Sequence, residues 1–91
     1  MKYVIRRTTQ FKKDFKLAKK RGCDMALLKN VITMLANGEQ LPSKYMNHFL
    51  SGRYGGYQEC HIESDWLLVY KIVESKLILS LIRTGTHSDL F

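Results

Sequence analysis

The sequence predicts an α+β domain in which a helical hairpin packs on a small antiparallel sheet. Two stretches with helical periodicity lie within the first 36 residues, and three apolar stretches of strand length follow residue 53. A short run of β-formers opens the chain. The order strand, helix, helix, strand, strand, strand is typical of helices gathered on one face of an antiparallel sheet. A chain of 91 residues has room for one modest core, so residues 1–91 are expected to form a single domain.

The first predicted elements are a strand at residues 3–5 and a helix after it. The hydroxyl of Thr8 or Thr9 can accept hydrogen bonds from the free N–H groups of a first helical turn. On a helical wheel the apolar side chains share one face: Phe11, Phe15 and Ala18. An adjoining face is basic: Lys12, Lys13, Lys16, Lys19 and Lys20. Gly22 is the predicted end of this helix.

A second helix is predicted from Met25 to Ala36, with Asp24 as its cap and Asn37-Gly38 as its end. Its apolar residues cover about half of the helical wheel, which is wide enough to face both the first helix and a sheet. Residues 39–53 lack clear periodicity, and loops of this length in compact domains are usually functional. His48 lies in this loop, either as a site residue or as a solvent-facing histidine.

The remaining strands are predicted at residues 54–62, 66–73 and 76–84. Short connections make consecutive strands antiparallel neighbours, so the polar residues around 61–66 and 83–87 should meet at one edge of the sheet. If Glu63-Ser64 and Glu74-Ser75 are two-residue turns, then His61, Trp66 and Arg83 form one cross-strand row on one face. A longer turn would preserve the meeting at this edge and change the shared face.

The composition restricts the class of protein. The formal charge is +7, and nine of the fifteen basic residues fall in the first 21 positions. Such a local basic face favours a phosphate-bearing or acidic partner, although a solvated lysine-rich helix is the simpler alternative. Cys23 and Cys60 form neither a disulfide framework nor a zinc spacing, so we expect packed, reduced thiols and no metal or cofactor. No signal peptide or membrane span is apparent, so a cytoplasmic protein is expected.

The two polar clusters contain the residue types that cleave RNA without a metal. One group removes the proton of a ribose 2′-hydroxyl, a second protonates the leaving 5′-oxygen, and a guanidinium balances charge on the phosphoryl oxygens. His61, Asp65, Arg83 and His87 supply such groups, and Trp66, Tyr57 or Phe91 could stack on an unpaired base. Each also has a structural reading, such as a core anchor for Trp66, and spacing alone does not decide between them.

Three ordered segments resemble the YafQ branch of the RelE/ParE toxin superfamily. They are Tyr45–Gly52, Glu59–Tyr70 and Arg83–Phe91, and the similarity extends to Phe15–Arg21 in the first helix. The resemblance implies a RelE-like fold and a type II toxin, which is a ribosome-dependent endoribonuclease that cuts translated mRNA in the decoding site. It also implies two partners, the 70S ribosome with its mRNA and a cognate antitoxin of the DinJ/RelB kind, and contact with DNA only through the antitoxin complex.

The resemblance also implies roles for individual residues. The acid/base candidates of YafQ-like toxins match His48, His61, Asp65 and His87, and the family arginine matches Arg83. We expect His87 to be the general acid, Asp65 or His61 the base, and Arg83 the group that stabilises the transition state. The RNA-binding candidates are Trp66, Phe91, Arg53, Lys12, Lys16 and Lys19.

Two departures from the family pattern concern the long loop and the first strand after it. Asn47-His48-Phe49 stands where Asp-His-Pro is frequent, and Gln58 stands where an arginine is common. Arg53 is the candidate that replaces the lost phosphate contact.

Two other functions compete with RNA cleavage. A ParE-like inhibitor of DNA gyrase uses the same general fold and needs no set of histidines. A non-enzymatic basic RNA-binding module would keep the lysines and tolerate loss of His87. Three histidines together with Asp65 and Arg83 favour the nuclease.

Overall fold

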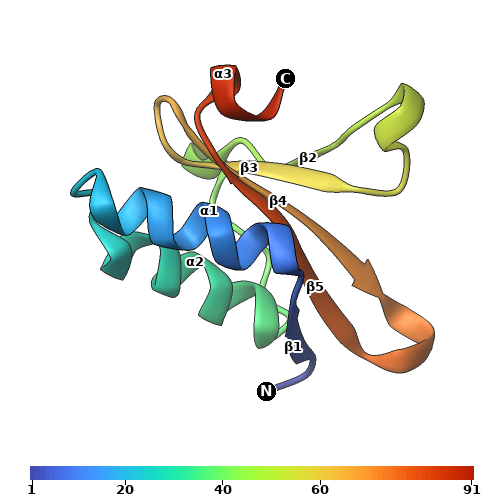
Figure 1. Ribbon diagram of the computed structural model, residues 1–91. Coiled ribbons are helices and arrows are strands. Elements are labelled where there is room, and N and C mark those ends of the chain that lie inside the picture. Colours follow the sequence, from blue (N-terminus) through green and yellow to red (C-terminus); the bar gives the residue numbers. More distant parts are fainter.

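Two helices cover one face of a five-stranded mixed sheet, and a third, one-turn helix lies at the C-terminal end (Figure 1). The computed structural model describes residues 1–91. The strands are β1 (Val4–Arg7), β2 (His48–Phe49), β3 (Gln58–Glu63), β4 (Trp66–Val73) and β5 (Ile78–Gly85). The helices are α1 (Thr9–Lys20), α2 (Met25–Ala36) and α3 (His87–Leu90). Short 3-10 turns occupy Ser43–Tyr45, Gly52–Tyr54 and Glu74–Lys76. None of the helices is long and apolar enough to cross a membrane.

The strand order is β1-β5-β4-β3-β2, and β2 to β5 form the predicted antiparallel sheet. β1 departs from it, because it pairs in parallel with β5 and so makes the sheet mixed. The long loop also contains more structure than predicted, since β2 adds a short antiparallel strand at the outer edge of β3. The α+β architecture with a helical hairpin is confirmed.

The ends of α1 and α2 follow the predicted capping residues. The side chain of Thr8 accepts a hydrogen bond from the Phe11 backbone N–H at 3.1 Å, and that of Asp24 accepts one from Ala26 at 3.1 Å. Gly22 follows α1 with φ of 81°, a left-handed conformation that glycine adopts without a steric cost. Local sequence therefore determines both helix starts and the first helix end.

Alternating residues of the strands separate a large core from a small one. Fifteen buried residues, among them Trp66, Leu68 and Tyr70 of β4, pack under α1 and α2. On the opposite face only Leu67, Val69 and Leu90 are buried together, with Leu50, Tyr57 and Ile82 packed against them. We call this second side the open face. It carries the polar residues that the sequence singled out.

The predicted row of His61, Trp66 and Arg83 is wrong. Glu63 pairs with Trp66, so the turn between β3 and β4 is Ser64-Asp65, and a register shift between residues 61 and 63 sets His61 opposite Leu67. The β-bulge takes up one residue, which a count from the turn does not include.

The connection from β4 to β5 is longer than the predicted turn at Glu74-Ser75. Val73 pairs with Ile78, so four residues connect the strands, and Leu77 completes the turn in the left-handed conformation with φ of 52°. A second register shift then sets Arg83 opposite Val69. This connection lacks the Asn-Gly sequence that favours a two-residue hairpin, and it forms the 3-10 turn Glu74–Lys76 instead.

Candidate active site

The two polar clusters meet at one edge of the sheet, as predicted, and α3 brings their histidines together on the open face. His61 lies opposite Leu67, and Leu67 opposite Gly85, where β5 ends. The chain then turns into α3, whose first residue is His87. The ring centroids of His61 and His87 are 5.8 Å apart, with the planes inclined at 62°. Residues 26 positions apart in sequence thus form one histidine pair.

Asp65 holds His87 through two hydrogen bonds. Its Oδ1 lies 2.7 Å from Nδ1 of His87 and accepts the backbone N–H of the same residue at 3.0 Å. These bonds, the backbone one first, lower the pKa of the Asp65 carboxyl below its ordinary value. A carboxylate that accepts from Nδ1–H leaves Nε2 as the nitrogen that faces outward. Asp65 therefore orients His87 and is itself a weak base.

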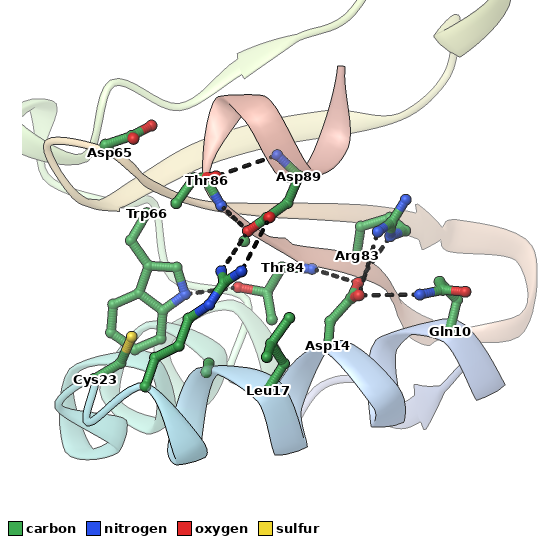
Figure 2. A pocket seen from close by; sticks show the side chains of 13 residues that line it. Gln10, Asp14, Leu17, Cys23, Asp65, Trp66, Arg83, Thr84, Thr86 and Asp89 are labelled. Carbon is green, nitrogen blue, oxygen red and sulfur yellow. Dashed lines mark hydrogen bonds and ion pairs between the residues drawn. The ribbon is translucent and has the colours of Figure 1, made fainter.

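α3 is held in place by a second carboxylate, that of Asp89 (Figure 2). Asp89 accepts the backbone N–H of Thr86 at 2.9 Å in a capping box and forms an ion pair at 2.7 Å with Arg21, the residue that follows α1. The Arg21 guanidinium, followed by the Thr86 N–H, holds the pKa of Asp89 well below its usual range. Gly85 permits this packing, because a Cβ there would lie 2.9 Å from an Asp89 oxygen. The ion pair between Arg21 and Asp89 thus positions α3, the helix that carries His87.

Arg83 is fixed by Asp14, a residue that the sequence analysis did not single out. Nε and Nη2 of Arg83 donate to the Asp14 carboxylate at 2.8 and 3.2 Å, and Asp14 also accepts the backbone N–H of Thr84 (Figure 2). β1 pairs with β5 only as far as Leu81, so the carboxylate covers part of β5 beyond β1. The Asp14 bond raises the pKa of Arg83. A signal was present, since Asp14 falls on the apolar stripe between Phe11 and Ala18.

Glu59 is a second residue that sequence reasoning missed. It is only 5% exposed, and its Oε1 lies 3.5 Å from Nε2 of His48, the residue opposite it on β2. Nδ1 of His48 lies 2.8 Å from the Met46 carbonyl oxygen. Both ring nitrogens of His48 thus lie near oxygen atoms of neighbouring residues. Strand alternation signalled this arrangement, because Cys60 and Ile62 are apolar and Glu59 shares the face of His61.

The predicted RNA-binding aromatics lie in different environments. Trp66 is 6% exposed under the helices, and its indole N–H donates to the Thr84 hydroxyl at 3.0 Å, so it is a core residue and not a stacking surface. Trp66 points to the same face as Leu68 and Tyr70 of β4 and belongs to the large core, although it follows the polar turn directly. Phe91 is 57% exposed and contacts Tyr54 edge to face at 5.5 Å. Arg53 is exposed in the 3-10 turn Gly52–Tyr54.

The basic residues of α1 are exposed, as the helical wheel predicted: Lys12, Lys13, Lys16, Lys19 and Lys20. No carboxylate lies within ion-pair distance of any of them; Arg21, at the end of the helix, is paired with Asp89. Both cysteines are free thiols, and burial raises the pKa of Cys60 to about 12. Cys60 is thus a packing residue, as expected.

The chain is similar to known proteins over nearly its whole length. A family model described as "Bacterial toxin of type II toxin-antitoxin system, YafQ" matches residues 3–91. The mRNA interferase toxin YafQ of Escherichia coli strain K12 is 46% identical over 83 residues, which are 90% of this chain and 88% of that protein. The crystal structure of YafQ from E. coli strain BL21(DE3) has a TM-score of 0.92 at 42% identity and covers 98% of both chains. A chain of the E. coli DinJ-YafQ complex has a TM-score of 0.90 at 43% identity, with the same coverage.

The matched residues include every helix, every strand and the whole of the site described above. The fold and the site therefore define a toxin of the type II toxin-antitoxin class. Within that class the chain belongs to the YafQ family, as the resemblance of its three sequence segments predicted.

Proposed function

We propose that this toxin is an endoribonuclease that cuts translated mRNA in the decoding site of the ribosome. The observation that carries the proposal is the contact between His61, Asp65 and His87 on the open face, where two imidazole rings lie 5.8 Å apart and one is oriented by a carboxylate. Two histidines at this separation can flank one phosphate and move protons on both sides of it. The E. coli relative is named an mRNA interferase, which agrees with this chemistry.

The proposed reaction assigns a proton transfer to each histidine. His61 removes the proton of the ribose 2′-hydroxyl, and the resulting oxygen attacks the adjacent phosphorus. The bond from phosphorus to the 5′-oxygen breaks, and His87 donates the proton from Nε2 to that oxygen. The products are a 2′,3′-cyclic phosphate and a 5′-hydroxyl end. Asp65 supports the imidazolium of His87 through Nδ1. Of the two bases that the sequence left open, His61 is favoured, because the lowered pKa of Asp65 makes it a poor proton acceptor.

Two further groups belong to the proposed site on the open face. Arg83 is oriented by two bonds to Asp14 and is proposed to stabilise the negative charge that develops on the phosphoryl oxygens. His48, whose ring lies between Glu59 and the Met46 carbonyl, is proposed as a further acid/base group beside the histidine pair. Both residues lie in the row His48, Glu59, Val69, Arg83, which crosses the sheet beside the histidine pair.

The proposed partners are the 70S ribosome with its mRNA and an antitoxin of the DinJ/RelB kind. The likeness to a chain of the DinJ-YafQ complex supports the antitoxin, through which the toxin would meet DNA. A substrate on ribosomes implies action in the cytoplasm.

The exposed lysines of α1 are proposed to contact ribosomal RNA. Lys12, Lys16 and Lys19 changed together to Gln should lower affinity for ribosomes by about tenfold or more at low salt and reduce its salt dependence by about three charges, measured by sedimentation at several salt concentrations. The matched control changes Lys29, Lys44 and Lys76 to Gln, which removes equal charge from elsewhere on the surface. Equal losses in the two triple variants would assign α1 a role in solubility only.

The decisive experiment is a primer-extension map of a defined mRNA in a purified translation system, with and without ribosomes. New 5′ ends that appear only with ribosomes, at fixed positions within codons, are the expected result, and they would reveal the codon preference. Intact RNA under both conditions would contradict the proposal and redirect attention to gyrase inhibition or to RNA binding without cleavage.

A further inference from the structure

A polar cluster joins the segment before β2 to β3 and β4. Asn47 directly precedes β2, Gln58 begins β3, and Tyr70 lies in β4. The Tyr70 hydroxyl donates a hydrogen bond to Oδ1 of Asn47. Nδ2 of Asn47 donates to Oε1 of Gln58 at 3.2 Å, and that oxygen lies 3.1 Å from the Tyr70 hydroxyl oxygen. We call these three residues the amide cluster, and the proposed proton transfers use none of them.

The cluster brings together two departures from the family pattern. Asn47 stands where an aspartate is frequent, and Gln58 stands where an arginine is common, so two neutral amides are in contact where an acid and a base are usual. Gln58 pairs with Tyr70 across β3 and β4, and both side chains therefore lie on the face of the large core. The proposed site is on the opposite, open face. Position 58 is thus placed to hold the loop and not to contact a phosphate of the substrate.

The strand that carries His48 has little else to fix its register. β2 is only two residues long and makes two pairs with β3. A slip of one residue would move His48 to the other face of the sheet. Asn47 and His48 are neighbours in the chain, and their side chains contact opposite faces. Asn47 bonds to Gln58 and Tyr70 on the face of the large core, and His48 lies near Glu59 on the open face.

Tyr70 is a firm anchor for the cluster. Its side chain is 1% exposed and belongs to the large core. Burial raises the pKa of its hydroxyl, so the group stays protonated and able to donate. Among residues 39–47, only Asn47 forms a side-chain hydrogen bond to a strand. We propose that the amide cluster positions His48, because it fixes the register of β2 and keeps the imidazole on the open face. The consequence for cleavage rests on the proposed function.

The first test measures the register of β2 in the free protein, without RNA. NMR of the parent should show a cross-strand contact between His48 and Glu59, which face each other on β2 and β3. Tyr70→Phe removes one hydroxyl and keeps the ring. It should weaken this contact and speed hydrogen exchange at the Leu50 amide, which bonds to the Tyr57 carbonyl at 2.9 Å, by about tenfold. An unchanged contact and unchanged exchange in Tyr70→Phe would overturn the proposal.

Tyr3→Phe is the matched control for the loss of a hydroxyl. Tyr3 is 4% exposed in the same core, and its hydroxyl donates to Glu74 at 2.7 Å, at the other end of the sheet's β4–β5 connection. This variant loses the same group and one hydrogen bond, so it should keep the β2 register and the cleavage rate of the parent. A β2 register disturbed equally in both variants would reduce the effect to general destabilisation and overturn the proposal.

The second test replaces the amide pair by an acid and a base. The double variant Asn47→Asp, Gln58→Arg can form an ion pair, so it should keep the β2 register and cleave ribosome-bound mRNA within about twofold of the parent. Asn47→Ala should cleave about tenfold more slowly. Gln58→Arg alone gives its guanidinium no acid and should be slower than the double variant. Faster cleavage by Gln58→Arg alone than by the parent would assign position 58 to a phosphate contact and overturn the proposal.

The inference and the proposed function can fail separately. If the parent cuts no mRNA, the nuclease assignment fails, and the NMR measurements still decide about the register of β2. If the parent cuts, Tyr70→Phe should add nothing to the loss caused by His48→Ala, because a positioning residue acts only through the group that it positions. Losses that multiply would show that Tyr70 acts apart from His48 and would overturn the proposal while leaving the nuclease intact.

Discussion

The two faces of the sheet differ in how completely their side chains are buried and hydrogen-bonded. Under α1 and α2, fifteen residues are buried together, and even the indole N–H of Trp66 has a partner. On the open face only three apolar residues are buried together, and a histidine pair, an arginine and an exposed phenylalanine surround them. Both faces are built by the same strands, through alternate residues.

Within β3, β4 and β5, the residues that stabilise the fold therefore differ from the residues proposed to carry the chemistry. Burial of apolar area on the covered face supplies most of the folding free energy. The open face can therefore keep titratable groups in water, where they are able to exchange protons with a substrate. α3 connects the two faces, since the ion pair between Asp89 and Arg21, at the end of α1, positions His87 on the open face. Substitutions on the open face should accordingly reduce activity with little effect on stability. Substitutions on the covered face should reduce stability with little effect on the activity of the folded protein.

The largest expected effect on activity comes from the open face. His87→Ala should reduce the rate of ribosome-dependent cleavage by about 100-fold to 10,000-fold, because it removes the proposed general acid. Its ring is exposed, so the free energy of unfolding should change by only about 0.5 kcal/mol. Single-turnover cleavage and urea unfolding measure the two quantities. Full cleavage activity in this variant would contradict the proposed acid.

The covered face should show the reverse pattern. Leu68→Ala should lower the free energy of unfolding by about 2 to 5 kcal/mol, because it leaves a cavity under the helices at a fully buried position. Cleavage by the folded fraction should stay unchanged when assayed well below the unfolding temperature. Leu27→Ala, at a leucine 37% exposed on α2, is the control and should cost about 0.5 kcal/mol. A specific loss of cleavage in folded Leu68→Ala would show that the faces are coupled.

A smaller effect on activity is expected at Glu59, which lies on the open face and is nevertheless buried. Glu59→Gln should slow cleavage about tenfold, which corresponds to losing one charge-assisted hydrogen bond of about 1.5 kcal/mol. If Glu59 acts through His48, the double variant Glu59→Gln, His48→Ala should be no slower than His48→Ala alone. Losses that multiply would assign Glu59 a role independent of His48. Unfolding curves of each variant separate these effects from a loss of folded protein.

The smallest expected effect is a change in the pH dependence of stability when the ion pair between Arg21 and Asp89 is removed. Asp89 and Asp65 both have pKa values below the ordinary value, Asp89 chiefly because of Arg21 and Asp65 chiefly because of the His87 backbone N–H. A carboxyl whose pKa is lowered by folding contributes stability that is present above its unfolded pKa, near 3.9, and is lost as pH falls toward the folded pKa. The free energy of unfolding should therefore decline below about pH 4.

Arg21→Gln removes the main cause of the lowered pKa of Asp89, so its stability should fall less steeply below about pH 4. Near neutral pH the variant should be only slightly less stable than the parent, because the ion pair is largely exposed. Urea unfolding at a series of pH values measures both quantities. Parallel curves for parent and variant would show that the ion pair does not stabilise α3.

Much of the fold could be predicted because its signals are local. Thr8, Asp24 and Gly22 cap or end the helices through bonds and dihedral angles within a few residues of themselves. The strand cores at Leu67–Val73 and Leu79–Thr84 follow from runs of apolar residues. β1 was expected as a strand, but its parallel pairing with β5 joins residues 74 positions apart and leaves no local signal.

The candidate site could be predicted in part. His61, Asp65 and His87 were expected to meet because short turns bring consecutive strands to one edge, and this holds whatever the register. The positions of Arg83 and Trp66 depend on register, which two bulges and a four-residue connection altered. Asp14 and Glu59 were missed because their importance lies in partners on other elements, although each breaks a local apolar or alternating pattern.

The sequence by itself determined the elements, the helix caps, the basic face of α1 and the residue types available for chemistry, because each depends on neighbours within one or two turns. Only the tertiary structure decided which side chains share a face and which are held by a partner. Pairing register shifts by one residue at each bulge, and such a shift moves a side chain to the opposite face of the sheet. For this reason Trp66 is a core residue, while His61, four positions before the end of its hairpin turn, faces the histidine of α3.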